Sequence, residues 1–214
     1  FDRATRRGIV ATAVGAYRTA MRRLAEERDL DVWHERVDVE SLMQHFEGEA
    51  TKKERKKFER NVAKARTKDS LKAFSKLAHE VNGELRIISD PPLIVPLDEL
   101  FAARRDEAEK RLRAVLGAYR ATLPDARRHL LDRFHYVHTA RKVVGVGSVG
   151  TRAYIVLLLG RDRQDPLFLQ AKEAEASVLE PYTAPSSYEQ HGQRVVEGQR
   201  LMQAASDNFL GWLT

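Results

Sequence analysis

The glycine pattern G-x-G-x-x-G at residues 145–150, taken with its flanks, is the feature that most constrains how this chain folds. Residues 141–144 before it and residues 151–159 after it are rich in side chains that favour strands. A dinucleotide-binding turn needs a helix directly after its last glycine, because the helix N-terminus must face the pyrophosphate. The flanks therefore predict a strand, a glycine loop and a second strand, whereas a helix directly after Gly150 would favour a nicotinamide-binding protein.

A third strand is expected over residues 167–172, after the turn-rich segment 160–166. Its length is similar to that of the run before the turn, so antiparallel pairing brings Lys172 back towards the glycine loop. Glycines let backbone N–H groups approach phosphate oxygens, and a nearby ammonium group neutralises phosphate charge. We therefore expect a nucleotide phosphate site formed by Lys172 together with Gly145, Val146, Gly147, Ser148, Val149 and Gly150. The alternative is a structural glycine hairpin with a solvated lysine.

A kinase-type lysine needs an acidic partner on the next helix, which holds the ammonium group in position for the α- and β-phosphates. The sequence predicts such a helix from the serine pair at 186–187 to Ala205, with the serines as its cap. Glu197 lies in the middle of this helix, where packing fixes a side chain best, so we expect it to orient Lys172. Two alternatives are Glu189 near the helix start, and a Glu197 that only pairs with an arginine of its own helix.

Four strings of residues resemble the bacterial family catalogued as domain of unknown function 2252. They are residues 89–96, 141–150, 169–173 and 192–207, and the resemblance extends over most of the chain. That family is similar to protein kinases and aminoglycoside phosphotransferases. The resemblance implies that the chain binds ATP with magnesium as part of a kinase-like phosphotransferase, with Lys172 and Glu197 in catalytic positions. It does not identify the acceptor substrate.

The motifs that would complete such an enzyme are missing from this sequence. The family carries a Gly-Asp-x-His-type catalytic loop and an Asp-Phe-Asp-like metal stretch, both upstream of the glycine loop. The nearest candidates, at residues 132–134 and 207–209, lack the strand–turn context that such motifs need. Because the chain begins at Phe1, we expect an internal segment that holds nucleotide but does not transfer phosphate by itself.

Positive charge is concentrated between Lys52 and Lys68, where nine basic and two acidic residues give a local charge of +7. Such a run is either a solvated helix face or a binding surface for an acidic partner. It holds one aromatic residue, Phe58, and no recognised nucleic-acid motif, so sequence-specific recognition is not expected. The second hypothesis is therefore a non-catalytic interaction module or pseudokinase, in which this helix binds an acidic partner.

Composition excludes several other classes of protein. The chain has no cysteine, which excludes disulfides, thiolate zinc sites and thiol nucleophiles. The lack of cysteine fits a reducing cytoplasm, which is the location we expect, and no apolar run is long enough to span a bilayer, so we expect no membrane partner. His129, Asp132, His135 and His138 are close in sequence, but they lack the H-E-x-x-H form, so no metal site is expected.

Hydrophobic periodicity predicts an α+β fold. Helices are expected over residues 5–27, 39–48, 51–65, 69–81, 97–122 and 125–137, with Trp33 as a core anchor in a short segment at 31–37. The Asn82–Gly83 pair is a turn signal, and a short strand pair is expected within residues 84–96. Residues 209–213 are predicted to form a last strand. We expect a mainly helical region at 1–137 and a kinase small-lobe-like region, an antiparallel sheet with one packed helix, at 138–214.

Overall fold

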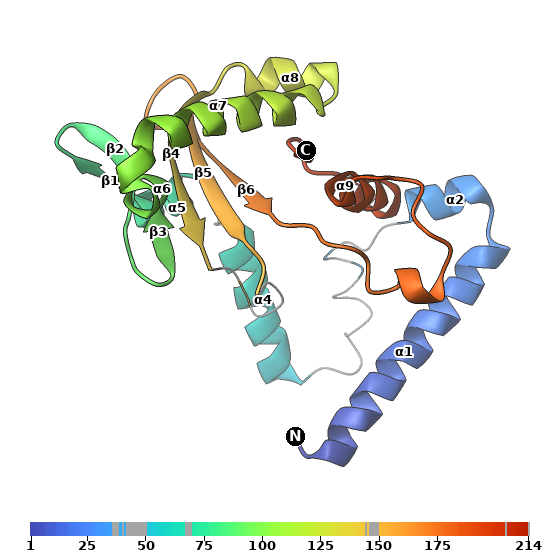
Figure 1. The fold of residues 1–214 in the computed structure, drawn as a ribbon. Helices are drawn as coiled ribbons and strands as arrows, with labels where there is room; N and C mark the ends of the chain where they lie inside the picture. Colours follow the sequence, from blue (N-terminus) through green and yellow to red (C-terminus); the bar gives the residue numbers. More distant parts are fainter. Residues whose placement is uncertain are drawn as a thin grey trace. The chain divides into compact units, whose positions relative to one another are not determined.

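The computed structural model describes residues 1–35, 39, 41, 51–66, 70–143, 145, 150–203 and 205–213. It divides the chain into two compact units, Phe1–Ala50 and Thr51–Thr214. Figure 1 shows the elements of both units. The helix expected over residues 39–48 lies almost entirely outside the described residues.

The first unit contains two helices, α1 (Arg3–Glu26) and α2 (Asp29–His34). The Asp2 carboxylate caps α1 by accepting the Thr5 backbone N–H at 2.7 Å. The first predicted helix is thus confirmed to within two residues at its start and one at its end. The expectation that Trp33 anchors a core is wrong, since its side chain is 62% exposed. Neither α1 nor α2 holds a buried residue, so within this unit these helices offer no core for an indole.

The second unit is built around a four-stranded antiparallel sheet in the order β3–β4–β5–β6 (Figure 1). The strands are β3 (Ile94–Pro96), β4 (His135–Lys142), β5 (Ala153–Leu159) and β6 (Pro166–Lys172). Strands β5 and β6 confirm the two strands predicted after the glycine pattern, whereas β4 overlaps the strand predicted at residues 141–144 only at Arg141 and Lys142. In β5 all residues except Tyr154 are buried, because both faces of this central strand are covered.

A two-stranded hairpin of β1 (Ala78–Val81) and β2 (Glu84–Ile87) follows helix α5 (Ser70–Leu77). Asn82 and Gly83 both have positive φ angles, 52° and 83°, as a two-residue hairpin turn of Asn-Gly requires. The helix predicted up to residue 81 therefore ends at Leu77, because residues 78–81 pair with residues 84–87 instead. The main core joins this hairpin to the large sheet through Ile87, Ile94, Ala140, Ile155 and Leu157.

The long helix predicted over residues 97–122 is interrupted near Phe101. It is divided into α6 (Leu97–Leu100), the 3-10 turn η1 (Ala102–Arg104) and α7 (Arg105–Ala121). Asp98 ties α6 to the strands, because its carboxylate accepts from the Arg86 guanidinium and lies 3.3 Å from His138 Nε2. Helix α8 (Asp125–Leu131) ends earlier than predicted, since the chain enters β4 at His135.

The remaining elements of this unit are α4 (Lys52–Arg66), the 3-10 turn η3 (Glu180–Tyr182) and α9 (His191–Met202). The strand predicted at residues 209–213 is wrong, and the described residues there form a non-regular segment. The backbone of this C-terminal segment is hydrogen-bonded not to a neighbouring strand but to two side chains, one on α7 and one on the residue that follows α7. The Tyr119 hydroxyl donates to the Phe209 carbonyl at 2.6 Å, and Thr122 Oγ1 accepts the Trp212 N–H at 3.1 Å.

These elements confirm the α+β class, with two antiparallel sheets among the described residues. Strand β4 crosses residue 137, where the sequence was expected to change from a helical to a sheet region. Its pairing with β3 joins residues 94–96 to the sheet that carries the glycine loop.

Candidate functional site

The glycine loop connects the end of β4 at Lys142 to the start of β5 at Ala153. Of its residues, the structure describes Gly145 and Gly150, while residues 146–149, with Val146, Gly147, Ser148 and Val149, lie outside the described residues. Gly150 has a φ of 91°, a left-handed conformation that favours glycine. A strand follows this glycine, so the helix that would favour a nicotinamide site is not found at this position.

Lys172 is the last residue of β6 and lies opposite Ala153, the first residue of β5. Its side chain is exposed. Paired residues share a face of the sheet and successive residues alternate, so Lys172 lies on the face that carries Ile155 and Leu157. That face bears the main core, and Lys172 stands at its glycine-loop end.

A second lysine lies on the same face at the same end of the sheet. Arg141 is paired with Tyr154, so Lys142, one residue further on, shares the face of Ala153 and Lys172. Because neighbouring strands lie about 4.8 Å apart, the Cα atoms of Lys142 and Lys172 are roughly 10 Å apart with β5 between them. Two ammonium groups next to a glycine loop can together bind a phosphate group that carries more than one negative charge.

An ion pair joins the residue before β5 to the residue after β6, directly beyond Lys172. The Glu173 carboxylate accepts the Arg152 backbone N–H and the Arg152 Nε–H, each at 3.0 Å, and it also accepts from Nη2. The Glu173 backbone N–H in turn donates to the Arg152 carbonyl at 2.9 Å. The hydrogen bond from the Arg152 side chain is the main cause that lowers the pKa of Glu173 below its usual value of 4.5. These contacts fix the backbone on which Lys172 is carried.

Glu197, the expected partner of Lys172, forms an ion pair with Arg200 of its own helix at 2.8 Å. The Arg200 guanidinium also donates to the Leu210 carbonyl and lies 5.7 Å from the ring centre of Trp212. Among the described residues no ion pair joins Glu197 to Lys172. Glu197 instead belongs to the contacts that hold the C-terminal segment.

The start of α9 also differs from the prediction. The helix begins at His191, and the Gln190 side chain, not a serine, caps it by accepting the Gln193 N–H at 2.6 Å. Ser186 Oγ accepts the Tyr188 N–H in the preceding turn. Glu189, the second candidate for the lysine partner, is exposed and precedes the helix. Serine is among the residues preferred at this position and glutamine is not, so the sequence pattern favours the serine pair over Gln190.

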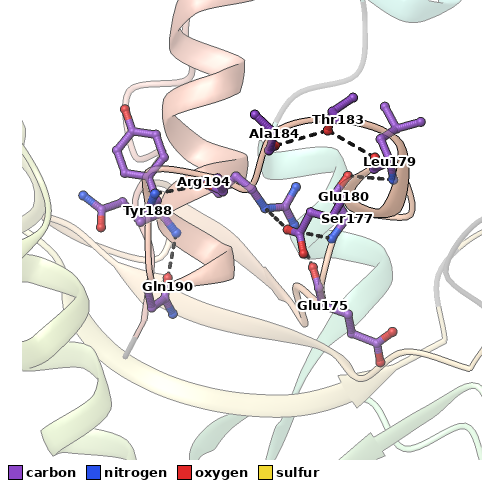
Figure 2. Close-up of polar contacts among 11 residues, drawn as sticks. Glu175, Ser177, Leu179, Glu180, Thr183, Ala184, Tyr188, Gln190 and Arg194 are labelled. Carbon is purple, nitrogen blue, oxygen red and sulfur yellow. Dashed lines mark hydrogen bonds and ion pairs between the residues drawn. The ribbon is translucent and has the colours of Figure 1, made fainter.

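Arg194 ties α9 to the loop that follows Lys172. Figure 2 shows its guanidinium reaching from the helix to this loop, where it donates to the Glu175 carbonyl at 2.7 Å. Arg194 Nε lies 3.9 Å from the Glu180 carboxylate, which also accepts the Ser177 N–H at 3.3 Å. Arg194, on the first turn of the helix, therefore connects α9 to the loop between β6 and α9.

The histidines that lie close in sequence are separated in their roles. His135 and His138 are both in β4, and His138 Nδ1 accepts the Ile87 backbone N–H at 3.1 Å. Within the described ranges, no group of three or more histidine, aspartate or glutamate side chains is arranged to hold a metal ion.

Comparison with models of known protein families gives a match that includes the residues around Lys172. The model of the family described as "Uncharacterized protein conserved in bacteria (DUF2252)" matches residues 1–214. The chain belongs to that family. No curated protein and no solved structure matches this DUF2252 chain. Among its described helices, none combines the length and the apolar character that crossing a bilayer requires.

Three charged residues near the site were not identified from the sequence: Lys142, Arg152 and Glu173. These residues could have been identified from the sequence if the pairing register of β5 and β6 had been known. If Lys172 is opposite Ala153, antiparallel pairing puts Glu173 opposite Arg152, and alternation puts Lys142 on the face of Lys172. The sequence patterns around the glycines do not contain this register.

Proposed function

We propose that this DUF2252 chain binds the phosphate groups of ATP at the glycine-loop end of its sheet, as the nucleotide-holding part of a kinase-like phosphotransferase. The observation that supports the proposal most is the register of β5 and β6, in which Lys172 lies opposite Ala153. A strand, glycine loop, strand and third strand with a lysine is the arrangement that kinases use to cover nucleotide phosphates. In this proposal the four-stranded sheet with α9 is similar to a kinase small lobe.

The roles follow from the charges at that end of the sheet. Lys172 neutralises the α- and β-phosphates, and Lys142 on the same face binds a neighbouring phosphate oxygen. The backbone N–H groups of the glycine loop, from Gly145 to Gly150, donate to the phosphates. Glu173 and Arg152 hold the strand ends in place through their ion pair. Glu197 binds Arg200 through Oε1 in this structure, so it orients Lys172 either through its other carboxylate oxygen or after releasing Arg200.

Transfer of the phosphoryl group needs a base and metal ligands in addition to these residues. The described residues hold no acidic cluster that fits magnesium, so no step through the metal is assigned to them. We therefore expect the 214-residue chain to bind ATP and ADP without hydrolysing ATP or phosphorylating an acceptor.

Calorimetric titration of ATP tests the proposal with Lys172→Met and a matched Lys110→Met control on the exposed side of α7. Loss of a charge that binds phosphate costs about 1.5–3 kcal/mol, so Lys172→Met should weaken ATP binding roughly 10- to 100-fold. The control should bind like the wild type. A wild-type chain that binds no ATP, or an unchanged affinity in Lys172→Met, would refute the proposal.

Glu197→Gln and Arg200→Gln test the role of Glu197 separately. If Glu197 orients Lys172, Glu197→Gln weakens ATP binding and Arg200→Gln does not. If Glu197 acts only through Arg200, neither variant changes ATP affinity, and Arg200→Gln lowers thermal stability more because it also loses the contacts with Leu210 and Trp212.

A further inference from the structure

Helix α4 carries a strip of exposed cationic side chains along one side. These residues, which we call the basic face, are Lys52, Lys53, Lys56, Lys57 and Arg60. At 3.6 residues per turn they fall within an arc of about 140°, and they extend over roughly 12 Å of helix axis. Ala63 is the one other described side chain within that arc. The face is therefore a continuous row of positive charge.

The other side of α4 is less exposed. Arg55, Phe58 and Val62 are half-buried, and at helical spacing they lie about 130–170° from the centre of the basic face. Their burial keeps the basic face turned towards solvent.

The N-terminus of α4 is fixed by a capping box. The Glu54 carboxylate accepts the Thr51 N–H at 2.9 Å and the Thr51 hydroxyl at 2.7 Å, and the Glu54 N–H donates to Thr51 Oγ1 at 3.3 Å. Hydrogen bonds from Thr51 lower the pKa of Glu54, which keeps this carboxylate ionised and bound at the cap. Glu59 lies just outside the margin of the arc, so no acidic side chain interrupts the basic face.

The chemistry of the face selects its partner. Protein interfaces are depleted in lysine and centred on apolar or aromatic anchors, which the basic face does not have. Binding of single strands relies on bases stacked on aromatic rings, and Phe58 is on the opposite side of the helix. An amphipathic helix that lies in a membrane inserts a broad apolar face, but here the side opposite the basic face offers only the half-buried Phe58 and Val62 beside the charged Arg55. A duplex, with one negative charge per about 1.7 Å of axis, needs only a row of cations.

We propose that the basic face of α4 docks on the phosphate backbone of duplex nucleic acid without reading its sequence. The inference does not depend on the proposed nucleotide site, since α4 and β6 are separate elements and the experiment contains no ATP. Five phosphate contacts predict a slope of log K against log salt concentration of about −4.5, so affinity falls roughly 500-fold between about 50 and 200 mM salt.

The experiment measures fluorescence anisotropy of a labelled duplex DNA of about 20 base pairs with the full 214-residue chain. The test variant is Lys56→Glu/Lys57→Glu, and the control is Lys76→Glu/Lys110→Glu, which changes net charge equally on α5 and α7. Glutamate and lysine have similar helix propensities, so α4 should stay folded. We expect at least tenfold weaker binding and a salt slope reduced by about 2 in the test variant, with a much smaller change in the control.

Three results would overturn the inference: no binding of duplex DNA at 50 mM salt, equal loss in test and control variants, or binding of phosphatidylserine vesicles or polyglutamate that is tighter and equally dependent on Lys56 and Lys57. If the charge-reversal variant does not fold, judged by circular dichroism, Lys56→Gln/Lys57→Gln replaces it. The neutral variant should lower the salt slope by the same amount, because it removes the same two phosphate contacts.

Discussion

The backbone N–H of Ile87 donates to Nδ1 of His138 across the contact between β2 and β4, at a distance of 3.1 Å. The other ring nitrogen, Nε2, lies 3.3 Å from the Asp98 carboxylate, which also binds Arg86. One imidazole thus joins the β1–β2 hairpin, helix α6 and the large sheet. Because Ile87 is 1% exposed, its N–H has no access to water if this acceptor is removed.

His138→Ala should therefore lower the free energy of unfolding by about 2–4 kcal/mol, from a buried unpaired N–H and a small cavity. His138→Asn keeps an acceptor at the position of Nδ1, so it should lose less. Urea denaturation of both variants measures the difference. Equal losses in the two variants would show that the Ile87 hydrogen bond contributes little.

The Glu173–Arg152 ion pair predicts a dependence of stability on pH. The pKa of Glu173 is lowered in the folded chain, so its contribution is present above its unfolded pKa, near 4.5, and is lost as the pH falls through the folded value. Wild-type stability should fall below pH 4.5 more steeply than that of Glu173→Gln, measured as urea midpoints from pH 7 to pH 3. Arg152→Gln should reproduce the flatter profile, and a glutamine variant that parallels the wild type would exclude this pair as the cause.

Gly211 is required by close packing of the C-terminal segment. A Cβ atom there would lie 2.8 Å from Thr122 Oγ1 and 3.0 Å from Tyr119 Cε2. Gly211→Ala should destabilise the chain by about 1–3 kcal/mol, because the segment must move away from α7. Gly198→Ala on α9, with nothing within 4 Å, should instead stabilise by up to about 1 kcal/mol through helix propensity. Thermal denaturation of the two alanine variants compares them directly, and a neutral Gly211→Ala would contradict the packing.

Arg194 is expected to order the loop between β6 and α9. Arg194→Ala removes the hydrogen bond to the Glu175 carbonyl, so amide hydrogen exchange should become roughly 10- to 100-fold faster at residues 175–182. The matched control is Arg163→Ala, which removes an arginine bonded to Glu80 at the opposite end of β6. Exchange at residues 175–182 should not change in the control. Equal protection in wild type and Arg194→Ala would show that the loop is ordered without this residue.

Local patterns were sufficient for part of this structure. The β-prone flanks of the glycines predicted β5 and the last two residues of β4, Asn82–Gly83 predicted a hairpin turn, and apolar periodicity predicted α1 and α4. Each prediction rests on backbone preferences within a few residues. The patterns failed where contacts with another segment decided the structure. Residues 78–81, predicted as helix, pair with residues 84–87 as a strand, and residues 209–213, predicted as a strand, are not one.

In the predicted site, too, one residue could be placed from local patterns and the other depended on packing. Lys172 was identified because the strands on either side of the turn at residues 160–166 have similar lengths. Antiparallel pairing of strands of similar length brings the end of the second strand back to the start of the first. Glu197 was assigned to Lys172 from its place along a helix, but which residue it meets depends on how α9 rotates and packs. In the structure that residue is Arg200, which also binds the C-terminal segment.

The amino-acid sequence by itself thus determined the family, the α+β class and the presence of a lysine on the third strand of the glycine hairpin, since these depend on short-range preferences and spacing. Only the tertiary structure decided the strand register, the Arg152–Glu173 ion pair and the partner of Glu197. Contacts between residues distant in the chain depend on packing and burial of the whole unit, and no local pattern contains that information.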